Sequence, residues 1–167
     1  NVTGIGNGAK NGVLIKGGEV LDRMNQVDTM VFDKTGTLTE GKMAVTTFSV
    51  VGQENPLGKA YLAAIEKESD HPLAQAVISY LGETKRFMVE QSQTVEGRGI
   101  QGIVDKKEIL IGNERLLKEK KVFVSNEEVQ KIDAIKSQGN SIVLVAIEGK
   151  LQYIIGVSDV VRPEAKE

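Results

Sequence analysis

The chain has 167 residues, of which 40% are hydrophobic and 26% charged, so it can bury a core and does not have a disordered composition. Its 21 basic and 23 acidic residues give a formal net charge of −2, which disfavours a nucleic-acid-binding domain. The absence of Cys and the single His exclude a disulfide scaffold, a thiolate zinc site and any site that needs two imidazoles. Neither a signal peptide nor an apolar run of the ~20 residues that span a bilayer is present, so we expect a soluble, cytosolic α/β or α+β piece.

The N-terminal part of the chain predicts two strands on either side of a polar loop. Residues 1–27 are rich in glycine, and within them Glu19–Asn25 fits a short helix. The apolar run Thr29–Phe32 is typical of a buried strand, and it stops at Asp33, where the polar loop begins. Val45–Val51 is the second predicted strand.

Two amphipathic helices in tandem are expected next. Asn55-Pro56 predicts a helix start, with Asn as the N-cap and Pro at the first helical position. Pro72 predicts the start of the second helix in the same way. Apolar side chains recur at helical spacing in both segments; they are Leu57, Ala60, Tyr61, Ala64 and Ile65, then Leu73, Ala76, Val77, Tyr80 and Leu81.

Further strands are expected in the second half of the chain. The segment Phe87–Ile111 is strand-like, with breaks at Gly97–Gly99 and Asp105–Lys107. The apolar runs Ile142–Ile147 and Leu151–Val157 predict a hairpin, because only a short polar turn separates them.

Two more helices are expected between these strands. Asn113–Lys120 fits a short helix, and Ser125 with Glu128 forms a capping box that predicts the start of another. The order of elements predicts one compact α+β unit over residues 46–155, with an antiparallel sheet flanked by helices.

A reactive site is indicated by the string DKTGTLTEG, which begins at Asp33. A carboxylate at the C-terminal end of a strand is a competent phosphate acceptor, because an acyl phosphate is a transferable intermediate. Such a site needs Mg²⁺ between the two anions and donors for the transferred oxygens. Thr35, Thr37 and the amides near Gly36 are candidate donors. Lys34 adds positive charge, and Asp33 with Thr35 are candidate magnesium ligands.

An ordinary polar turn explains an Asp at a strand end, but it does not explain the whole string. The string resembles the phosphorylation motif of P-type ATPases, the cation pumps of the haloacid-dehalogenase superfamily that pass through an aspartyl-phosphate. This resemblance implies that Asp33 is the phosphorylated residue and that ATP and Mg²⁺ are used. Many hydrolases of the superfamily carry a second Asp two positions later as the general acid, where this chain has Thr35. Without that acid, water attacks slowly, so the energy of the acyl phosphate can be held for a conformational step.

The segment at 69–74, Ser-Asp-His-Pro-Leu-Ala, points to one class of these pumps. It resembles the Ser-Glu-His-Pro-Leu-like motif in the nucleotide-binding domain of heavy-metal P-type ATPases, with Asp70 where Glu is usual. The resemblance implies that His71 helps to seat adenine and that Glu66 lies in the same site. On the residues alone, helix initiation explains Pro72, a helix cap explains His71, and a solvated helix face explains Glu66.

A GxGxxG string begins at Gly97, but the residues after it read as a strand, so the dinucleotide-binding interpretation fails on context. A turn between strands explains the glycines; alternatively, the missing side chains let the backbone approach a base or a phosphate. The string resembles the GxG motif of the same nucleotide-binding domain, which implies that Gly97 and Gly99 bind nucleotide. Gly112 and Asn113 resemble a Gly-Asn pair of that site, and Asn113 also fits the cap of the next helix.

The segment at 159–165 resembles the Asp-x-x-Arg-Pro segment where the chain of these pumps returns to the phosphorylation domain. This implies that Asp159 and Arg162 lie near the ATP and act at the hinge between domains. Linkers near residues 40–45 and 156–161 are then expected to allow the domains to move.

The resemblance covers essentially the whole chain and implies three parts. Residues 1–45 would be the N-terminal part of an incomplete, haloacid-dehalogenase-like α/β phosphorylation domain. Residues 46–155 would be the nucleotide-binding domain, and residues 156–167 the hinge return and the start of the second part of the phosphorylation domain. The membrane and actuator domains, and the Gly-Asp-Gly-x-Asn-Asp motif that completes the magnesium site, are not among these residues.

Three functions are compatible with these motifs. The first is the ATP-binding, aspartyl-phosphate-forming segment of a pump at the cytosolic face of a membrane, exporting copper or, alternatively, zinc, cadmium or cobalt. Its partners would be ATP and the remaining phosphorylation, actuator and membrane domains, with no nucleic acid. The second is a stand-alone phosphatase, against which Thr35 and the missing acidic residues argue. The third is a binding module without chemistry, which loss of Asp33 would not affect. For the isolated segment we expect ATP binding with little or no turnover.

Overall fold

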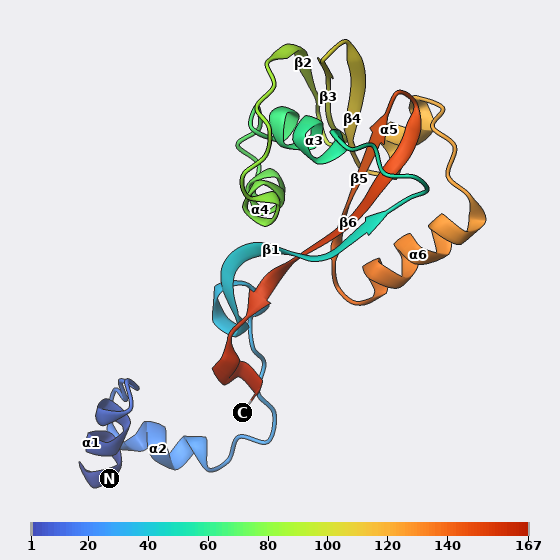
Figure 1. Ribbon diagram of the computed structural model, residues 1–167. Coiled ribbons are helices and arrows are strands. Elements are labelled where there is room, and N and C mark those ends of the chain that lie inside the picture. Colours follow the sequence, from blue (N-terminus) through green and yellow to red (C-terminus); the bar gives the residue numbers. More distant parts are fainter. Residues whose placement is uncertain (1, 167) are drawn as a thin grey trace. The chain divides into compact units, whose positions relative to one another are not determined.

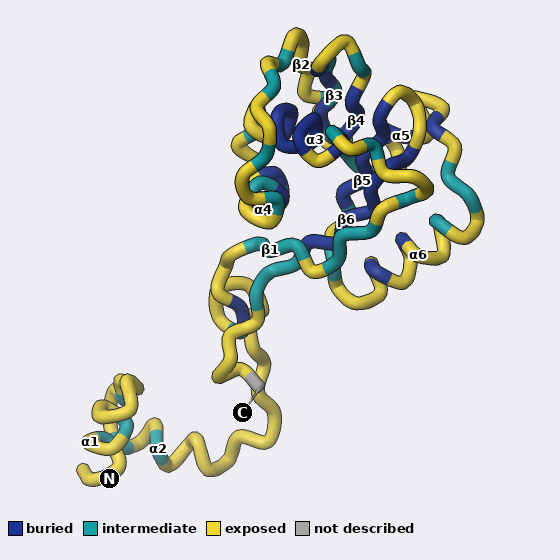
Figure 2. The backbone as a smooth tube through the Cα atoms, viewed as in Figure 1, coloured by how far each residue is buried: buried dark blue, intermediate teal, exposed yellow. Residues whose placement is uncertain are grey.

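A computed structural model describes residues 2–166, and the chain divides into two units between Lys34 and Thr35 (Figure 1). The first unit contains two short helices, α1 (Val2–Lys10) and α2 (Gly18–Met24). Helix α2 confirms the prediction, whereas α1 was not predicted because three of its nine residues are glycines, which are poor helix formers. Neither helix has a buried residue, as Figure 2 shows.

The strand predicted at Thr29–Phe32 is wrong. The backbone there forms no strand, and the side chains of Met30, Val31 and Phe32 are 64%, 91% and 57% exposed. A strand persists only when its backbone N–H and C=O groups pair with a neighbour. The described residues of this unit include no other strand, so the apolar run has nothing to pair with.

The second unit confirms the predicted fold class, because it is an antiparallel sheet with helices. Its six strands have the order β1-β6-β5-β4-β3-β2 (Figure 1). The strands are β1 (Thr39–Val50), β2 (Val89–Val95), β3 (Gly99–Val104), β4 (Lys107–Gly112), β5 (Ser141–Ile147) and β6 (Lys150–Val161). The helices are α3 (Gly58–Glu66), α4 (Pro72–Leu81), α5 (Glu114–Glu119) and α6 (Asn126–Ser137), with an irregular turn at Lys34–Leu38 and a 3₁₀ turn at Pro163–Lys166. No helix among the described residues is both long and apolar enough to cross a membrane.

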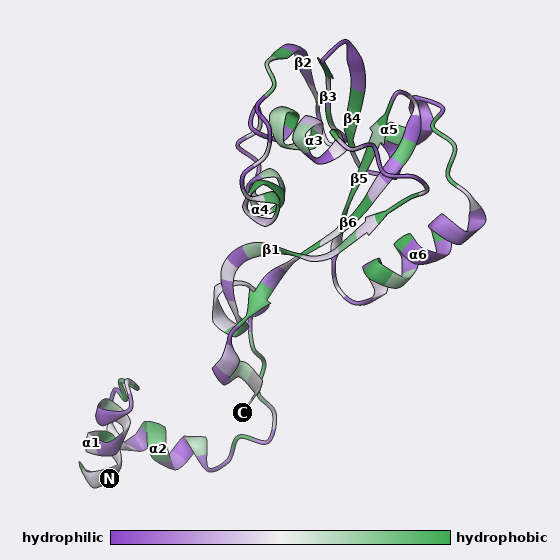
Figure 3. Cartoon of the chain, in the orientation of Figure 1, coloured by the Kyte–Doolittle hydropathy of each residue, from purple (hydrophilic) through white to green (hydrophobic). Residues whose placement is uncertain are grey.

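Helices pack on both faces of the sheet and create two hydrophobic cores. Helices α3 and α4 share one core with Ile109 and Ile111 of β4, while α5 and α6 share the other with Leu110. Strands β5 and β6 alternate in the same way, so nearly every residue in the middle of them is buried. This explains the uninterrupted apolar runs in the sequence, which Figure 3 shows along the central strands.

The predicted helix starts are mostly confirmed. Helix α4 begins at Pro72, and α6 begins after Ser125 with both hydrogen bonds of the capping box. The prediction for α3 was wrong, because the helix begins at Gly58 rather than after Asn55. The Asn55 side chain instead accepts a hydrogen bond from the Leu57 N–H at 2.9 Å, which closes a turn ahead of the helix.

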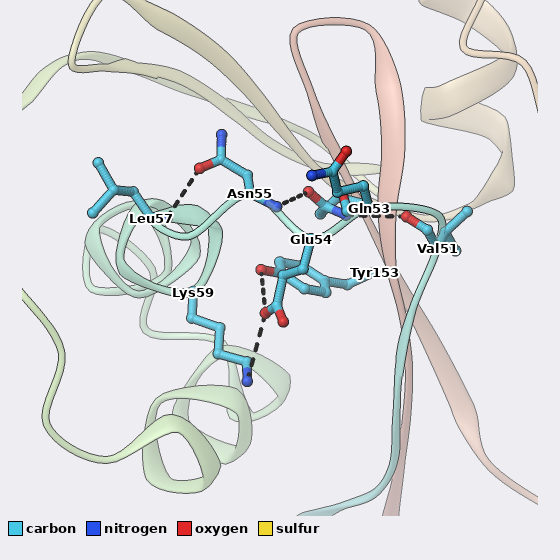
Figure 4. Close-up of polar contacts among 8 residues, drawn as sticks. Val51, Gln53, Glu54, Asn55, Leu57, Lys59 and Tyr153 are labelled. Carbon is cyan, nitrogen blue, oxygen red and sulfur yellow. Dashed lines mark hydrogen bonds and ion pairs between the residues drawn. The ribbon is translucent and has the colours of Figure 1, made fainter.

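The loop between β1 and α3 is fixed by the buried Gln152 of β6 (Figure 4). Its Oε1 accepts a hydrogen bond from the Asn55 N–H at 2.9 Å. Its Nε2 donates to the carbonyls of Val51 at 3.1 Å and Gln53 at 3.3 Å. One side chain therefore satisfies three backbone groups of a loop that has no strand partner there.

Tyr153, the next residue of β6, fixes the start of α3. Its hydroxyl donates to the Glu54 carboxylate at 3.1 Å, and Glu54 pairs with Lys59 at 3.5 Å (Figure 4). Burial, followed by the hydrogen bond and the charge of Glu54, raises the pKa of Tyr153 above its ordinary value, so the phenol stays protonated. These contacts set the direction of α3, whose last residue is Glu66.

Candidate functional site

A cavity of about 360 Å³ lies where α3, α4 and the β2–β4 strands meet. Its walls come from the end of α3, the start of α4, the turn between β2 and β3, and the end of β4. All six residues that the resemblance implies for nucleotide binding line it: Glu66, His71, Gly97, Gly99, Gly112 and Asn113. An apolar wall is formed by Leu73, Ala74, Ile100, Ile111, Ile142 and Val143.

Glu66 is a buried acid in this wall. Glu66 is only 4% exposed, so its interpretation as part of a solvated helix face is wrong. Within the described part of the chain its carboxyl group has no hydrogen bond or ion pair, and it ends α3, where the helix dipole disfavours an anion. Burial raises the pKa of Glu66 from 4.5 to about 7. Near neutral pH, a protonated Glu66 can donate a hydrogen bond into the cavity.

His71 caps α4, as one of the two interpretations predicted. Its ring Nδ1 accepts a hydrogen bond from the Leu73 N–H at 3.2 Å. The backbone N–H of His71 donates to the Ser69 hydroxyl at 3.2 Å. Because Nδ1 is an acceptor, the neutral ring carries its hydrogen on Nε2. The capping bond therefore leaves Nε2 as a donor, so a role as a cap does not exclude a role in binding.

Gly99 and Gly112 are required by the sheet itself. They pair across β3 and β4, and Gly99 has φ +147°. A Cβ on Gly99 would lie 2.5 Å from Gly112 Cα, and one on Gly112 would lie 2.8 Å from Leu116 Cδ2. The interpretation of the string that begins at Gly97 as a turn between strands is confirmed, because β3 and not a helix follows the turn.

Gly97 is a glycine for a different reason. It has φ +66°, and a Cβ there would meet nothing within 4 Å. The left-handed turn thus favours glycine, while the space beside it stays open toward solvent. Of the three glycines, Gly97 has the most room for another molecule to approach its backbone.

Asn113 holds the turn and α5 together. Its Oδ1 accepts hydrogen bonds from the N–H groups of Arg115 at 3.1 Å and Leu116 at 3.2 Å, which confirms the predicted cap. Its Nδ2 donates to the Gly97 carbonyl at 3.0 Å. Asn113 therefore positions one cavity wall against another, whether or not it also contacts a ligand.

Asp159 and Arg162 do not line this cavity; they hold the polar loop at the start of the second unit. Asp159 Oδ2 accepts a hydrogen bond from the Thr39 hydroxyl at 2.6 Å. Arg162 donates from Nε to the Thr39 carbonyl at 3.0 Å and from Nη2 to the Gly36 carbonyl at 3.3 Å. The segments expected as linkers, 40–45 and 156–161, are paired here as the ends of β1 and β6.

The candidate phosphate acceptor Asp33 and the candidate donors Lys34, Thr35 and Thr37 are exposed. Asp33 and Lys34 belong to the first unit, while Thr35 and Thr37 belong to the loop held by Arg162. No three His, Cys, Asp or Glu side chains among the described residues come together to hold a metal ion. Asp33 and Thr35 are oxygen donors suited to Mg²⁺, but by themselves they are not a complete magnesium site.

Comparison with known proteins decides the family. A model of the haloacid dehalogenase-like hydrolases matches residues 27–167. The chain belongs to this family. It is 40% identical over 168 aligned residues to a copper-exporting P-type ATPase of Staphylococcus haemolyticus, covering 99% of this chain and 20% of that protein. The chain therefore spans about a fifth of the length of that relative.

Solved structures of family members agree. The chain resembles a zinc-transporting PIB-type ATPase in its E2.Pi state with a TM-score of 0.80 and 30% identity, covering 98% of this chain and 27% of that one. It also resembles the catalytic domain of the CPx-ATPase CopB-B, described for its conformational changes upon nucleotide binding, with a TM-score of 0.63 and 28% identity. That likeness covers 90% of this chain and 51% of that one.

Sequence reasoning missed one charged residue of the cavity, Arg98. The sequence does not show where the side chain of a residue between two turn glycines points, because that direction depends on the conformation of the turn. Its place inside the GxGxxG string was the only available signal.

We predict that Gly99→Ala lowers the free energy of unfolding by at least ~2 kcal/mol, because the new Cβ would press on the backbone of β4. Gly97→Asn is the matched control, since Asn tolerates a left-handed conformation and the space there is open. Urea unfolding of both variants measures the difference. Equal stability of the two variants would contradict this account.

Because Glu66 is a buried acid, we predict that the stability of the fold depends on pH. Because the pKa of Glu66 is raised from 4.5 to about 7, the folded state binds the proton more tightly than the unfolded chain. The contribution of Glu66 is therefore fully present below pH 4.5 and is lost as the pH rises through 7. Glu66→Gln removes this loss. As the pH rises over this range, the free energy of unfolding of the variant should therefore increase by on the order of 3 kcal/mol relative to that of the unaltered chain.

Urea unfolding at pH 4.5, 6 and 8 measures this difference, with Glu68→Gln as the control because Glu68 is exposed two residues later. Stability curves of Glu66→Gln and the unaltered chain that run parallel over this range would show that Glu66 is not a buried acid.

Proposed function

We propose that this chain is the ATP-binding and phosphoryl-accepting segment of a heavy-metal P-type ATPase, located at the cytosolic face of a membrane and exporting copper. The observation that carries the proposal is the convergence of six residues from separate segments of the chain on one cavity. The likeness to copper-exporting P-type ATPases over 99% of the chain supports the class of protein.

The cavity suits a purine. Its apolar wall and the exposed backbone at Gly97 would enclose a flat ring. A base also needs hydrogen-bond partners, and the wall offers two: the Nε2–H of His71 and the carboxyl group of Glu66. A buried polar group left without a partner weakens binding, which favours a base over an apolar ring.

In the proposed transfer, a carboxylate oxygen of Asp33 forms a bond to the γ-phosphorus of ATP. The bond from that phosphorus to the bridging oxygen breaks, and ADP leaves with the electron pair. Lys34, Thr35 and Thr37 would donate hydrogen bonds to the transferred oxygens. Magnesium, held by Asp33, Thr35 and ligands outside these residues, would neutralise charge between the two anions. Closure of the domains would bring nucleotide and acceptor together.

The choice of metal rests on the relatives alone. The relative with 40% identity is a copper exporter, which favours copper. The structural likeness to a zinc-transporting ATPase, with a TM-score of 0.80, makes zinc the second candidate. The chain has no Cys and one His, so it offers no soft-metal site of its own.

ATP titration with and without Mg²⁺, followed by calorimetry, tests the proposed site. We expect saturable binding at one site, weakened on the order of tenfold in His71→Asn because the shorter Asn side chain cannot replace the imidazole Nε2–H as a donor to the base. Asn is a good N-cap, so this variant keeps the helix start intact. If a folded chain binds no ATP at millimolar concentration, the proposed site is wrong. The proposed site is also wrong if neither His71→Asn nor Glu66→Gln changes the affinity for ATP.

The isolated chain should turn over little or no ATP, because the catalytic magnesium site needs residues beyond it. Phosphate release from ATP and from a small phosphomonoester, each followed over hours, measures this. Steady turnover that Asp33→Asn abolishes would contradict the prediction, and rapid hydrolysis of the phosphomonoester would favour a phosphatase.

A further inference from the structure

Arg98 is the single Lys or Arg among the described residues that line the cavity. Its backbone is fixed at the cavity edge, because its N–H donates to the Val95 carbonyl at 3.0 Å and its carbonyl accepts from the Asn113 N–H at 2.9 Å. Among the described lining residues Glu66 is the one Asp or Glu, and it is buried. An anionic ligand group would therefore find its cation at Arg98.

The guanidinium of Arg98 is already engaged by an acid outside the cavity lining. Its Nη1 lies 2.5 Å from Oε2 of Glu119, the last residue of α5. The two side chains are 43% and 49% exposed. An ion pair this exposed contributes little to stability, so exchanging its acid for another anion costs little.

We propose that Arg98 recognises the phosphates of the nucleotide and that Glu119 competes with those phosphates for the same guanidinium. This inference rests on the proposed function. A guanidinium can bind two phosphate oxygens at once, and a polyphosphate carries more charge than one carboxylate. Glu119 holds the Arg98 guanidinium until a polyphosphate binds and replaces it. Glu119 thus weakens ATP and ADP binding without touching the base.

The chain supplies a matched control for each half of this exchange. Glu114 lies on the same helix, α5, and pairs with Lys136 of α6 at 2.8 Å, with exposures of 49% and 47%. Neither Glu114 nor Lys136 lines the cavity. Glu114→Gln therefore matches Glu119→Gln, because each removes one negative charge and one ion pair from α5. Lys136→Gln matches Arg98→Gln, because each removes the cation of one of these two ion pairs.

The experiment titrates ATP, ADP and adenosine by calorimetry into the 167-residue chain, these four variants and the double variant of Arg98→Gln with Glu119→Gln. Arg98→Gln should weaken ATP and ADP binding on the order of tenfold and leave adenosine binding unchanged. Glu119→Gln should strengthen ATP and ADP binding about two- to fivefold, also without affecting adenosine. The double variant should behave as Arg98→Gln does, because Glu119 acts only through Arg98.

The proposal is overturned if Arg98→Gln and Glu119→Gln change ATP affinity no more than their controls, or if adenosine and ATP change together. In both cases the unaltered chain still binds ATP, so the proposed function stands. If the folded, unaltered chain binds neither ATP nor adenosine, the proposed function and this inference fall together.

Discussion

The cavity depends on the close approach of two backbones where β3 begins and β4 ends. Gly99 faces Gly112 there, and a Cβ on either residue would overlap the opposite backbone or side chain. This contact brings the turn at Gly97 beside the start of α5, so that Asn113 can bond across to it. It also leaves Arg98 at the rim. The two missing side chains therefore set the positions of Arg98 and Asn113 in the site.

The cavity is electrostatically asymmetric, and this asymmetry limits what fits. At one end Glu66 is buried, with its pKa raised to about 7, so a neutral hydrogen-bonding group suits it better than an anion. At the rim Arg98 is exposed and cationic. A ligand with a neutral polar ring and an anionic tail matches both ends. A nucleotide has this form, whereas a simple phosphomonoester would leave the buried Glu66 without a hydrogen-bond partner.

Local signals in the sequence predicted most of the fold. Pro72 and the Ser125 capping box mark helix starts through contacts within a few residues, and the uninterrupted apolar runs of β5 and β6 predict a hairpin directly. Contacts distant in sequence were not predictable. The Thr29–Phe32 run failed because a strand needs a partner, and Asn55 was misplaced because Gln152, 97 residues away, shapes its loop. The burial of Glu66 likewise depends on tertiary packing.

The predicted site residues fall into two sets with separate structural tasks. One set surrounds the cavity, while Asp159 and Arg162 bind the loop that carries Thr35 and Thr37. The resemblance alone placed Asp159 and Arg162 near the ATP, but here their bonds go to Gly36 and Thr39. A buried Asp159 Oδ1 without a partner among the described residues shows that this second set still has bonding capacity. Loss of Asp159 or Arg162 should therefore disturb the conformation of this loop rather than that of the cavity, because neither residue lines the cavity.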